Sequence, residues 1–361
     1  MGAAGQLGSE VVDILRSEHE VVPATRNEAD IADLSRVLSL ADRVSPQVIV
    51  NAAAYTDVDG CESNKGKAFL VNAIGARNVA IAAREVGAKL VYISTDYVFD
   101  GAKEEPYLEF DPPYPINVYG MSKLLGEILV KEQTNQFFII RTAWLYGKTG
   151  SNFVKTMLRL AREREELRVV NDQRGTPTCG RDLSRQIAEL TQTESYGTYH
   201  CTSQGSCTWF EFALAIFKYA GYEAKVDPSG SVRLTPNPQA LTPSTQDLKP
   251  IIVSPVTSEE FPRPARRPKN SVLENFMLKL QGLDIMPLWE ESLAKFLRNV
   301  GRRYQVPDRR SQVGSIESEV GATFMIHESC AAKVSLIPKD NGNILWLLTI
   351  GHKPPTTDYH L

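Results

Sequence analysis

The chain has 361 residues, with 40 Lys and Arg against 43 Asp and Glu and a formal net charge of −3. This near-balance excludes the broad basic surface of most nucleic-acid-binding proteins. The length suffices for one large hydrophobic core and a smaller second lobe. The longest apolar stretch, residues 344–350, is far shorter than the roughly 20 residues that a membrane-spanning helix needs.

Five cysteines occur, at positions 61, 179, 201, 207 and 330. Their number is odd, and their spacing matches neither a metal site nor a disulfide framework. No signal peptide is evident, which is typical of proteins that keep their thiols reduced. We therefore predict a cytoplasmic protein without a metal centre, and with neither nucleic acid nor a membrane as a partner.

Glycines at positions 2, 5 and 8 open the chain, and an amphipathic run from Ser9 to Ser17 follows them. This spacing permits a tight turn, a close approach of the backbone to a pyrophosphate, and close packing of the next helix. The first turn of that helix would face the phosphates with its free N–H groups. We interpret Gly2, Gly5 and Gly8 as a dinucleotide-binding loop.

Between residues 20 and 170, short apolar runs alternate with segments of helical period, which is typical of a parallel sheet with flanking helices. The predicted strands are 20–24, 48–52, 89–94, 137–141 and 167–170. The predicted helices are 6–17, 31–43, 65–86, 118–131 and 152–164. From Arg181 onward the pattern is mainly helical, with 207–219 and 287–300 the clearest segments.

These patterns predict an α/β fold. Residues 1–170 would form a Rossmann-type, doubly wound parallel sheet that binds NAD(P). Residues 171–300 would form a smaller, mainly helical substrate lobe against the carboxyl ends of the strands. Residues 301–361 would form a tail.

The apolar run that begins at Lys89 ends at Ser94, Thr95 and Asp96. Open α/β sheets bind their ligands at the carboxyl ends of parallel strands. Thr95 is therefore a candidate to hydrogen-bond a substrate oxygen, and Asp96 a candidate to contact sugar hydroxyls. Capping of a helix or turn is the plainer role for both residues.

Tyr119 and Lys123 are four residues apart within a predicted helix, so both side chains share one face, one turn apart. A nearby ammonium favours the phenolate, which would lower the Tyr119 pKa from about 10 towards neutrality. A tyrosine tuned in this way can exchange a proton with a carbonyl or alcohol oxygen. Because a solvated helix face often has the same spacing, the pair gains weight mainly from its neighbours.

Together, the glycine loop, the strand end and the Tyr-Lys pair resemble the extended short-chain dehydrogenase/reductase family. More narrowly, they resemble the dTDP-4-dehydrorhamnose reductase family, through segments 51–59, 94–101, 141–147, 172–178 and 263–271. The resemblance runs from Gly2 to about Asn299, with one break in the carboxyl-terminal third. It implies NADPH- or NADH-dependent reduction of dTDP-4-dehydro-6-deoxy-L-mannose to dTDP-L-rhamnose.

The resemblance also implies residue roles. Tyr119 would donate a proton, with Lys123 and Thr95 as the other catalytic residues. Trp144 would bind the substrate together with Thr95 and Asp96, although an indole buried for packing alone is an alternative. The implied cofactor-binding set is Gly2, Gly5, Gln6, Leu7, Gly8, Arg26, Asp30, Ile31, Ala53, Ala54, Tyr55, Tyr119 and Lys123.

Arg26 follows predicted strand 20–24, where no Asp or Glu is available for a ribose 2′-hydroxyl. An Arg there can accept a 2′-phosphate, which favours NADPH and leaves NADH open. An ordinary surface charge explains Arg26 equally well. Glu10 matches a carboxylate that some family members use for Mg²⁺ at a dimer interface, but an acidic residue is expected in a first helical turn anyway. A homodimer is left open.

Tyr97 stands where sugar-nucleotide dehydratases have a Glu, which favours plain reduction over dehydration. Three alternatives remain. One is a non-catalytic regulatory subunit related to the methionine adenosyltransferase regulatory subunit, against which the intact Thr95, Tyr119 and Lys123 argue. The others are an inactive, amino-terminally truncated fragment and a reductase of a different 4-keto sugar nucleotide.

Three stretches depart from the family pattern. The family has a central strand before the glycine loop, so we expect the sheet to lack its first strand, through a misplaced start or a fragment. Residues 228–255 contain Pro236, Pro238, Pro243 and Pro250 and are expected to form a mobile insertion, because dense prolines cannot continue a helix or central strand. For residues 301–361, disorder, an added edge strand and a reading-frame artefact are all open.

Overall fold

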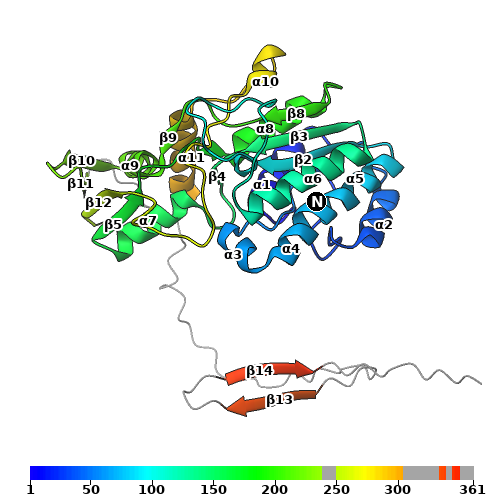
Figure 1. The fold of residues 1–361 in the computed structure, drawn as a ribbon, viewed down its shortest axis with the longest axis horizontal. Coiled ribbons are helices and arrows are strands. Elements are labelled where there is room, and N and C mark those ends of the chain that lie inside the picture. The colour runs from blue at the N-terminus through cyan, green and yellow to red at the C-terminus, as the bar shows by residue number, and fades with distance from the viewer. Residues whose placement is uncertain (238–248, 304–332, 339–343, 350–361) are drawn as a thin grey trace, which may run out of the picture. The chain divides into compact units, whose positions relative to one another are not determined.

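A computed structural model describes residues 1–237, 249–303, 333–338 and 344–349. The chain divides into two compact units, Met1–Val306 and Pro307–Leu361. In the second unit, β13 (Lys333–Pro338) pairs antiparallel with β14 (Ile344–Thr349), and these strands form a two-stranded sheet of their own (Figure 1).

The main sheet has four parallel strands, in the order β1-β2-β3-β8. They are β1 (Val48–Asn51), β2 (Lys89–Thr95), β3 (Phe137–Thr142) and β8 (Gly197–His200). The two central strands are apolar along most of their length, because both of their faces are covered. This confirms the predicted Rossmann-like parallel sheet.

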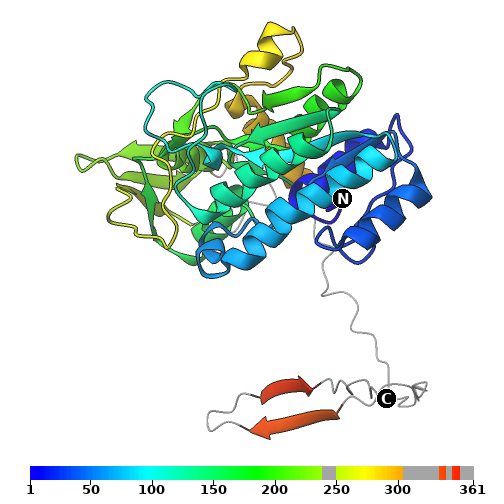
Figure 2. The same ribbon diagram turned by 45° about the vertical axis from the view of Figure 1, so that its right-hand side comes forward.

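Helices cover both faces of the sheet (Figures 1 and 2). On one face, α1 (Gln6–Leu15) and α8 (Gly180–Thr191) bury Leu7 and Leu183 against Val91. On the other face lie α2 (Leu34–Val44), α5 (Gly75–Glu85) and α6 (Val118–Gln133), which pack on Leu90 and Tyr92. Leu90, Val91 and Tyr92 alternate between the two faces because successive strand residues point in opposite directions.

The predicted strand 20–24 is wrong, since this segment is not a strand. One backbone hydrogen bond, from Ala3 N to Ala24 O at 3.1 Å, joins it to the glycine loop. Met1 lies between this segment and β1, and its nitrogen donates to Val50 O at 2.7 Å. Among the described residues no strand precedes α1. A ladder needs a continuing series of hydrogen bonds, and here residues 20–24 have no neighbouring strand to supply it.

The lobe contains a second sheet, in the order β10-β11-β12-β5, which the mainly helical pattern did not predict. Its strands are β10 (Tyr222–Val226), β11 (Val232–Pro236), β12 (Ile251–Val256) and β5 (Glu166–Val170). Helices α7 (Phe153–Glu163), α9 (Trp209–Tyr219) and α11 (Trp289–Arg303) complete the lobe's core. Predicted strand 167–170 therefore exists, but it belongs to the lobe's sheet, whereas the later β8 joins the main sheet.

The predicted mobile insertion at residues 228–255 is also wrong where the segment forms strands, because Pro236 ends β11 and Pro255 lies within β12. These two strands pair only over residues 232–234 and 251–253. Asn237 N donates to Gly221 O, just before β10, and Ile252 N donates to Glu165 O, just before β5. The N atoms of Pro236 and Pro255 therefore face the other side, at positions beyond the overlap of β11 and β12. Proline is tolerated where no ladder partner is available. Residues 238–248 lie outside the described part.

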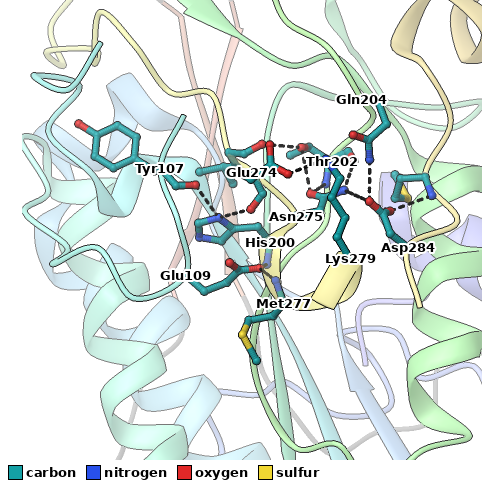
Figure 3. A network of polar contacts seen from close by, with 12 residues as sticks. Tyr107, Glu109, His200, Thr202, Gln204, Glu274, Asn275, Met277, Lys279 and Asp284 are labelled. Carbon is teal, nitrogen blue, oxygen red and sulfur yellow. Dashed lines mark hydrogen bonds and ion pairs between the residues drawn. The ribbon is translucent and has the colours of Figure 1, made fainter. Parts of the chain in front are cut away.

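A buried polar network joins the end of β8 to two loops (Figure 3). The His200 ring Nδ1 lies 3.1 Å from the carbonyl oxygens of both Tyr107 and Glu274. Glu109 Oε1 accepts from the backbone N of His200 and of Met277, each at 3.1 Å. Burial lowers the pKa of His200 to about 3, so its imidazole is neutral. The network fixes the segment that carries α10 (Phe276–Leu280) against the sheet.

Candidate active site

The glycine loop folds tightly against the end of β1. Gly2 has φ +74°, and a Cβ on it would meet Ala53 N at 2.7 Å. A Cβ on Gly8 would lie 2.1 Å from Gly2 O, so neither position can take a side chain. Gly5 is the N-cap of α1 and supplies no side-chain cap, which leaves the first N–H groups of α1 open to a phosphate. The loop therefore has the form that a dinucleotide cradle requires.

Two members of the implied cofactor set have other contacts. Leu7 is buried in the core between α1 and α8. The Gln6 side chain donates to Leu145 O at 2.8 Å, which ties the start of α1 to the segment after β3. Both residues nevertheless lie between Gly5 and Gly8, within the glycine loop.

Arg26 and Asp30 form an ion pair at the far end of the candidate cradle. Arg26 Nε donates to Asp30 Oδ2 at 2.9 Å, and the Arg26 side chain is 76% exposed. The Ala32 backbone N donates to the other Asp30 oxygen at 3.0 Å, and together these contacts lower the Asp30 pKa. Ile31 is buried, and its carbonyl accepts from Asn78. Arg26 is thus accessible to an anion but already has a partner.

Asn72 fixes the segment 53–55 at the end of β1, a role that the sequence analysis missed. Its Oδ1 accepts from Tyr55 N at 2.7 Å, and its Nδ2 donates to Tyr55 O at 3.0 Å and to Ser122 Oγ at 2.9 Å. Predicted helix 65–86 is interrupted around it, as α4 (Lys65–Phe69), a π-helical turn η1 (Leu70–Ile74) and α5. π-Turns often mark functional sites. The available signal was a polar Asn within an apolar helical run.

Thr95 and Tyr119 meet at the carboxyl end of β2. Asn117 caps α6 by accepting from Gly120 N at 2.8 Å, which orients the first turn and Tyr119. The Tyr119 side chain lies close enough to Thr95 and Asp96 for both residues to affect its pKa. Thr95 also accepts from Tyr97 N at 3.2 Å and so caps the short helix η2 (Asp96–Val98). This confirms the plainer capping role of Thr95, and its hydrogen bond to a substrate oxygen stays a prediction.

Asp96 is buried beside this pair. Thr95 Oγ1 donates to Asp96 Oδ1 at 2.8 Å, and only 3% of the Asp96 residue surface is exposed. Burial raises its pKa to about 6. Asp96 can therefore act as a polar contact for a sugar hydroxyl near the reacting oxygen.

The Lys123 ammonium points into the protein. Its Nζ donates to Ile93 O at 2.6 Å and lies 4.1 Å from the centre of the Tyr92 ring. Burial lowers the Lys123 pKa to about 7, although Glu127 opposes this shift. Lys123 is therefore close to its titration point at neutral pH.

The expected lowering of the Tyr119 pKa by Lys123 is wrong for this structure. Burial raises the Tyr119 pKa and the Asp96 carboxylate raises it further, while the hydrogen bond with Thr95 only partly offsets them. The physical cause is the cost of a phenolate out of water, which exceeds any help from an ammonium directed at Ile93. Tyr119 is accordingly protonated at neutral pH, which is the form that a proton donor needs.

Trp144 lies in the lobe-facing part of the site. Its ring stacks on Trp209 with a centroid distance of 3.5 Å, and its backbone φ is +45°. Gly175 approaches the indole so closely that a Cβ there would lie 2.4 Å from Trp144 Cε2. Trp144 is partly exposed, so packing and ligand contact are both open to it.

Glu10 is buried and accepts from Lys148 N at 3.1 Å. No group of three or more His, Cys, Asp or Glu side chains in the part of the chain described by the structure could hold a metal ion. Within the same part, no helix is both long enough and apolar enough to cross a bilayer.

Comparison with known proteins places this geometry in a family. The model of the RmlD substrate binding domain matches residues 1–302. A dTDP-4-dehydrorhamnose reductase from Burkholderia thailandensis is 39% identical over 83% of this chain and 97% of its own length. The spore coat polysaccharide biosynthesis protein SpsK of Bacillus subtilis is 40% identical over 82% of this chain and 95% of its own length.

Solved structures agree. A Bacillus anthracis dTDP-4-dehydrorhamnose reductase in complex with NADP has a TM-score of 0.74 and 47% identity, over 82% of this chain and 97% of that one. An orthologue from Clostridium acetobutylicum has a TM-score of 0.73 and 43% identity, over 83% and 97% of the two chains. On its sequence, fold and site geometry, the chain belongs to the dTDP-4-dehydrorhamnose reductase family of NAD(P)H-dependent oxidoreductases.

Proposed function

We propose that this chain reduces dTDP-4-dehydro-6-deoxy-L-mannose to dTDP-L-rhamnose, with NADPH as the favoured cofactor. The observation that carries the proposal is that Thr95, at the carboxyl end of β2, lies beside the face of α6 that holds Tyr119 and Lys123. The glycine loop fits the cofactor, because side chains are excluded at Gly2 and Gly8 and the N-cap Gly5 supplies no side chain to the first N–H groups of α1.

When bound, the reduced nicotinamide supplies the hydride for the 4-keto carbon. The Tyr119 hydroxyl donates its proton to the ketone oxygen, and Thr95 orients that oxygen by a hydrogen bond. Lys123 would hold the nicotinamide ribose when the cofactor is bound. Asp96 and Trp144 contact the sugar. The net change is one hydride added to carbon and one proton added to oxygen.

A specific observation favours a second candidate substrate. A dTDP-4-keto-6-deoxy-D-glucose reductase from Streptomyces niveus is 43% identical over 65% of this chain. The two substrates differ in sugar stereochemistry, which Trp144 and the lobe would sense and the Thr95-Tyr119-Lys123 group would not. Reduction of that sugar is therefore the alternative to test.

Three further proposals concern the setting of the reaction. Arg26 lies where it can accept the NADPH 2′-phosphate if it exchanges its contact with Asp30 for the phosphate. We also propose a cytoplasmic location, since a nucleotide-sugar reductase needs NADPH from that compartment, and a homodimer, which light scattering of the purified chain would test. A regulatory protein without turnover is disfavoured because all three candidate catalytic residues are present.

The decisive experiment follows NADPH oxidation by absorbance with each 4-keto sugar nucleotide generated in situ. We expect turnover of the first sugar, and a loss of roughly 10² or more in kcat for Tyr119→Phe, which removes the proton donor with little change in packing. Unchanged kcat in Tyr119→Phe would rule out the mechanism. NADPH binding without oxidation of either sugar would favour the regulatory alternative.

A further inference from the structure

Three consecutive residues of β2 contact one face of α6. The Ile93 carbonyl accepts from Lys123 Nζ at 2.6 Å. The Ser94 hydroxyl donates to Glu127 Oε1 at 2.5 Å, and Thr95 lies beside Tyr119. Tyr119, Lys123 and Glu127 are spaced by four residues and so share this face. Glu127 has no part in the chemistry described so far.

Glu127 is a buried carboxylate whose hydrogen bonds are supplied by two strands. Arg141 on β3 donates to it twice, from Nε to Oε1 at 2.9 Å and from Nη2 to Oε2 at 2.7 Å. The two side chains are 1% and 3% exposed. The Arg141 partner in the sheet register is Ser94 itself. The carboxylate is therefore fixed from three directions, by its own helix, by β2 and by β3.

Stability alone is a weak explanation of this pair. Removing two charges from water costs about as much as their attraction returns, and well-packed apolar residues often serve a fold equally well. A fully hydrogen-bonded ion pair next to a candidate catalytic lysine suggests instead a local electrostatic role. The helix turn between Glu127 and Lys123 brings an anion to an ammonium that is otherwise surrounded by the protein interior.

Among the described residues, Glu127 is the anion near Lys123, and the other groups around this lysine carry no negative charge. From α6 come Tyr119 and Glu127, and from β2 come the Tyr92 ring and the Ile93 carbonyl. Arg141 on β3 reaches this region through Glu127, and the uncharged Asn72 of η1 contacts the neighbouring Ser122 and Tyr92. Burial raises the pKa values of both tyrosines, which are therefore neutral near pH 7.

We propose that Glu127, fixed by Arg141 and Ser94, is a positioning residue that keeps Lys123 charged, so that its ammonium can bind the ribose of a nicotinamide nucleotide. The inference rests on the proposed reductase function only in the choice of cofactor. Its physical content is that a fixed anion one turn away opposes the burial that would discharge the lysine. The Lys123 pKa of about 7 is the balance of these two effects.

The test measures NADPH affinity by fluorescence titration across pH, for the wild type and for Glu127→Gln. Affinity should fall as the pH rises through the Lys123 pKa, because the ammonium is lost. Without the anion, the midpoint of that fall should move to lower pH by about one unit. Ser94→Ala, which removes one hydrogen bond and leaves the ion pair, should move it in the same direction by less. Glu127→Asp, which keeps the charge, should restore the wild-type midpoint.

Glu132→Gln is the matched control, since Glu132 is an exposed carboxylate on the same helix and its loss should leave the midpoint unchanged. A folded Glu127→Gln with an unmoved midpoint would overturn the inference. If Glu127→Gln does not fold, an unmoved midpoint in Ser94→Ala overturns it instead. Failure of the proposed function is distinguishable, because it would show as wild-type NADPH binding without reduction of the sugar.

Discussion

At the residue scale, Lys123 is the side chain on which cofactor binding and turnover should depend together. Lys123→Met removes the ammonium while its apolar replacement suits the buried position, so the fold should persist. We expect NADPH affinity and kcat each to fall by about tenfold or more, the value of one charge-assisted hydrogen bond. Titration and steady-state kinetics measure the two. Lys131→Met, at an exposed position of the same helix, is the control, and reduced turnover with unaltered affinity would contradict the dual role.

We expect the residue at position 175 to affect KM for the sugar, because Gly175 contacts Trp144. In Gly175→Ala the new Cβ would lie 2.4 Å from the indole, so the stacked ring must move, at a cost of about 1–3 kcal/mol. We expect KM for the sugar to rise about tenfold while NADPH affinity stays constant. Gly66→Ala is the matched control, because a Cβ there meets nothing within 4 Å. An unchanged KM in Gly175→Ala would remove Trp144 from the substrate site.

Residue spacing predicted part of this site and missed the rest for physical reasons. Tyr119 and Lys123 were recognisable because a separation of four residues defines a helix face whatever surrounds it. The Tyr119 pKa was not predictable, because its direction depends on burial, which no local pattern reports. Asn72 acts on a segment 17 residues away, so its role becomes visible only when the chain is folded.

At the element scale, Asp59 joins helix α3 (Val58–Ser63) to the segment 263–267. Burial would raise the Asp59 pKa, but hydrogen bonds from Arg267, Ala265 N and Arg263 outweigh it and lower the pKa to about 2. From the ordinary value of 3.8, this shift corresponds to about 2 kcal/mol of stability. Asp59→Asn should lose that amount at pH 7, as measured by urea unfolding.

The sign of the pH dependence follows from the direction of the shift. Because the folded state binds the Asp59 proton more weakly than the unfolded state, the stabilisation is present above pH 4 and disappears as the pH falls from about 4 to about 2. The difference between wild type and Asp59→Asn should therefore be smaller at pH 3 than at pH 7. Asp42→Asn, at an exposed position of α2, is the control. A difference independent of pH would show that the ion pairs are not its source.

Helices and strands were predicted best where the sequence of the segment alone indicates that it is buried. Strands β1, β2 and β3 are apolar runs, so their sequences identify them wherever the neighbouring strands lie. Residues 167–170 were equally apolar, but composition does not say which sheet a strand joins, and β5 pairs with β12 from the lobe. The prolines of β11 and β12 led to a wrong prediction. A proline cannot donate a hydrogen bond to the strand on one of its sides, but the strand can still pair on the other side.

At the scale of the whole molecule, the first compact unit and the match to the family model end at nearby residues. The first compact unit ends at Val306, and the family model ends at residue 302. A chain shortened to residues 1–306 should therefore keep the full-length affinity for NADPH, within about twofold, and the same thermal midpoint, since the first compact unit is kept whole. A chain shortened to residues 1–288 is the contrasting variant. It loses α11, whose Trp289, Leu293 and Leu297 are buried in the lobe's core, and at about 2–5 kcal/mol for each such side chain it should not fold.

Calorimetry and fluorescence titration would compare the three chains. Loss of NADPH binding in the chain of residues 1–306 would mean that residues 307–361 contribute to the cofactor site, contrary to the division into units.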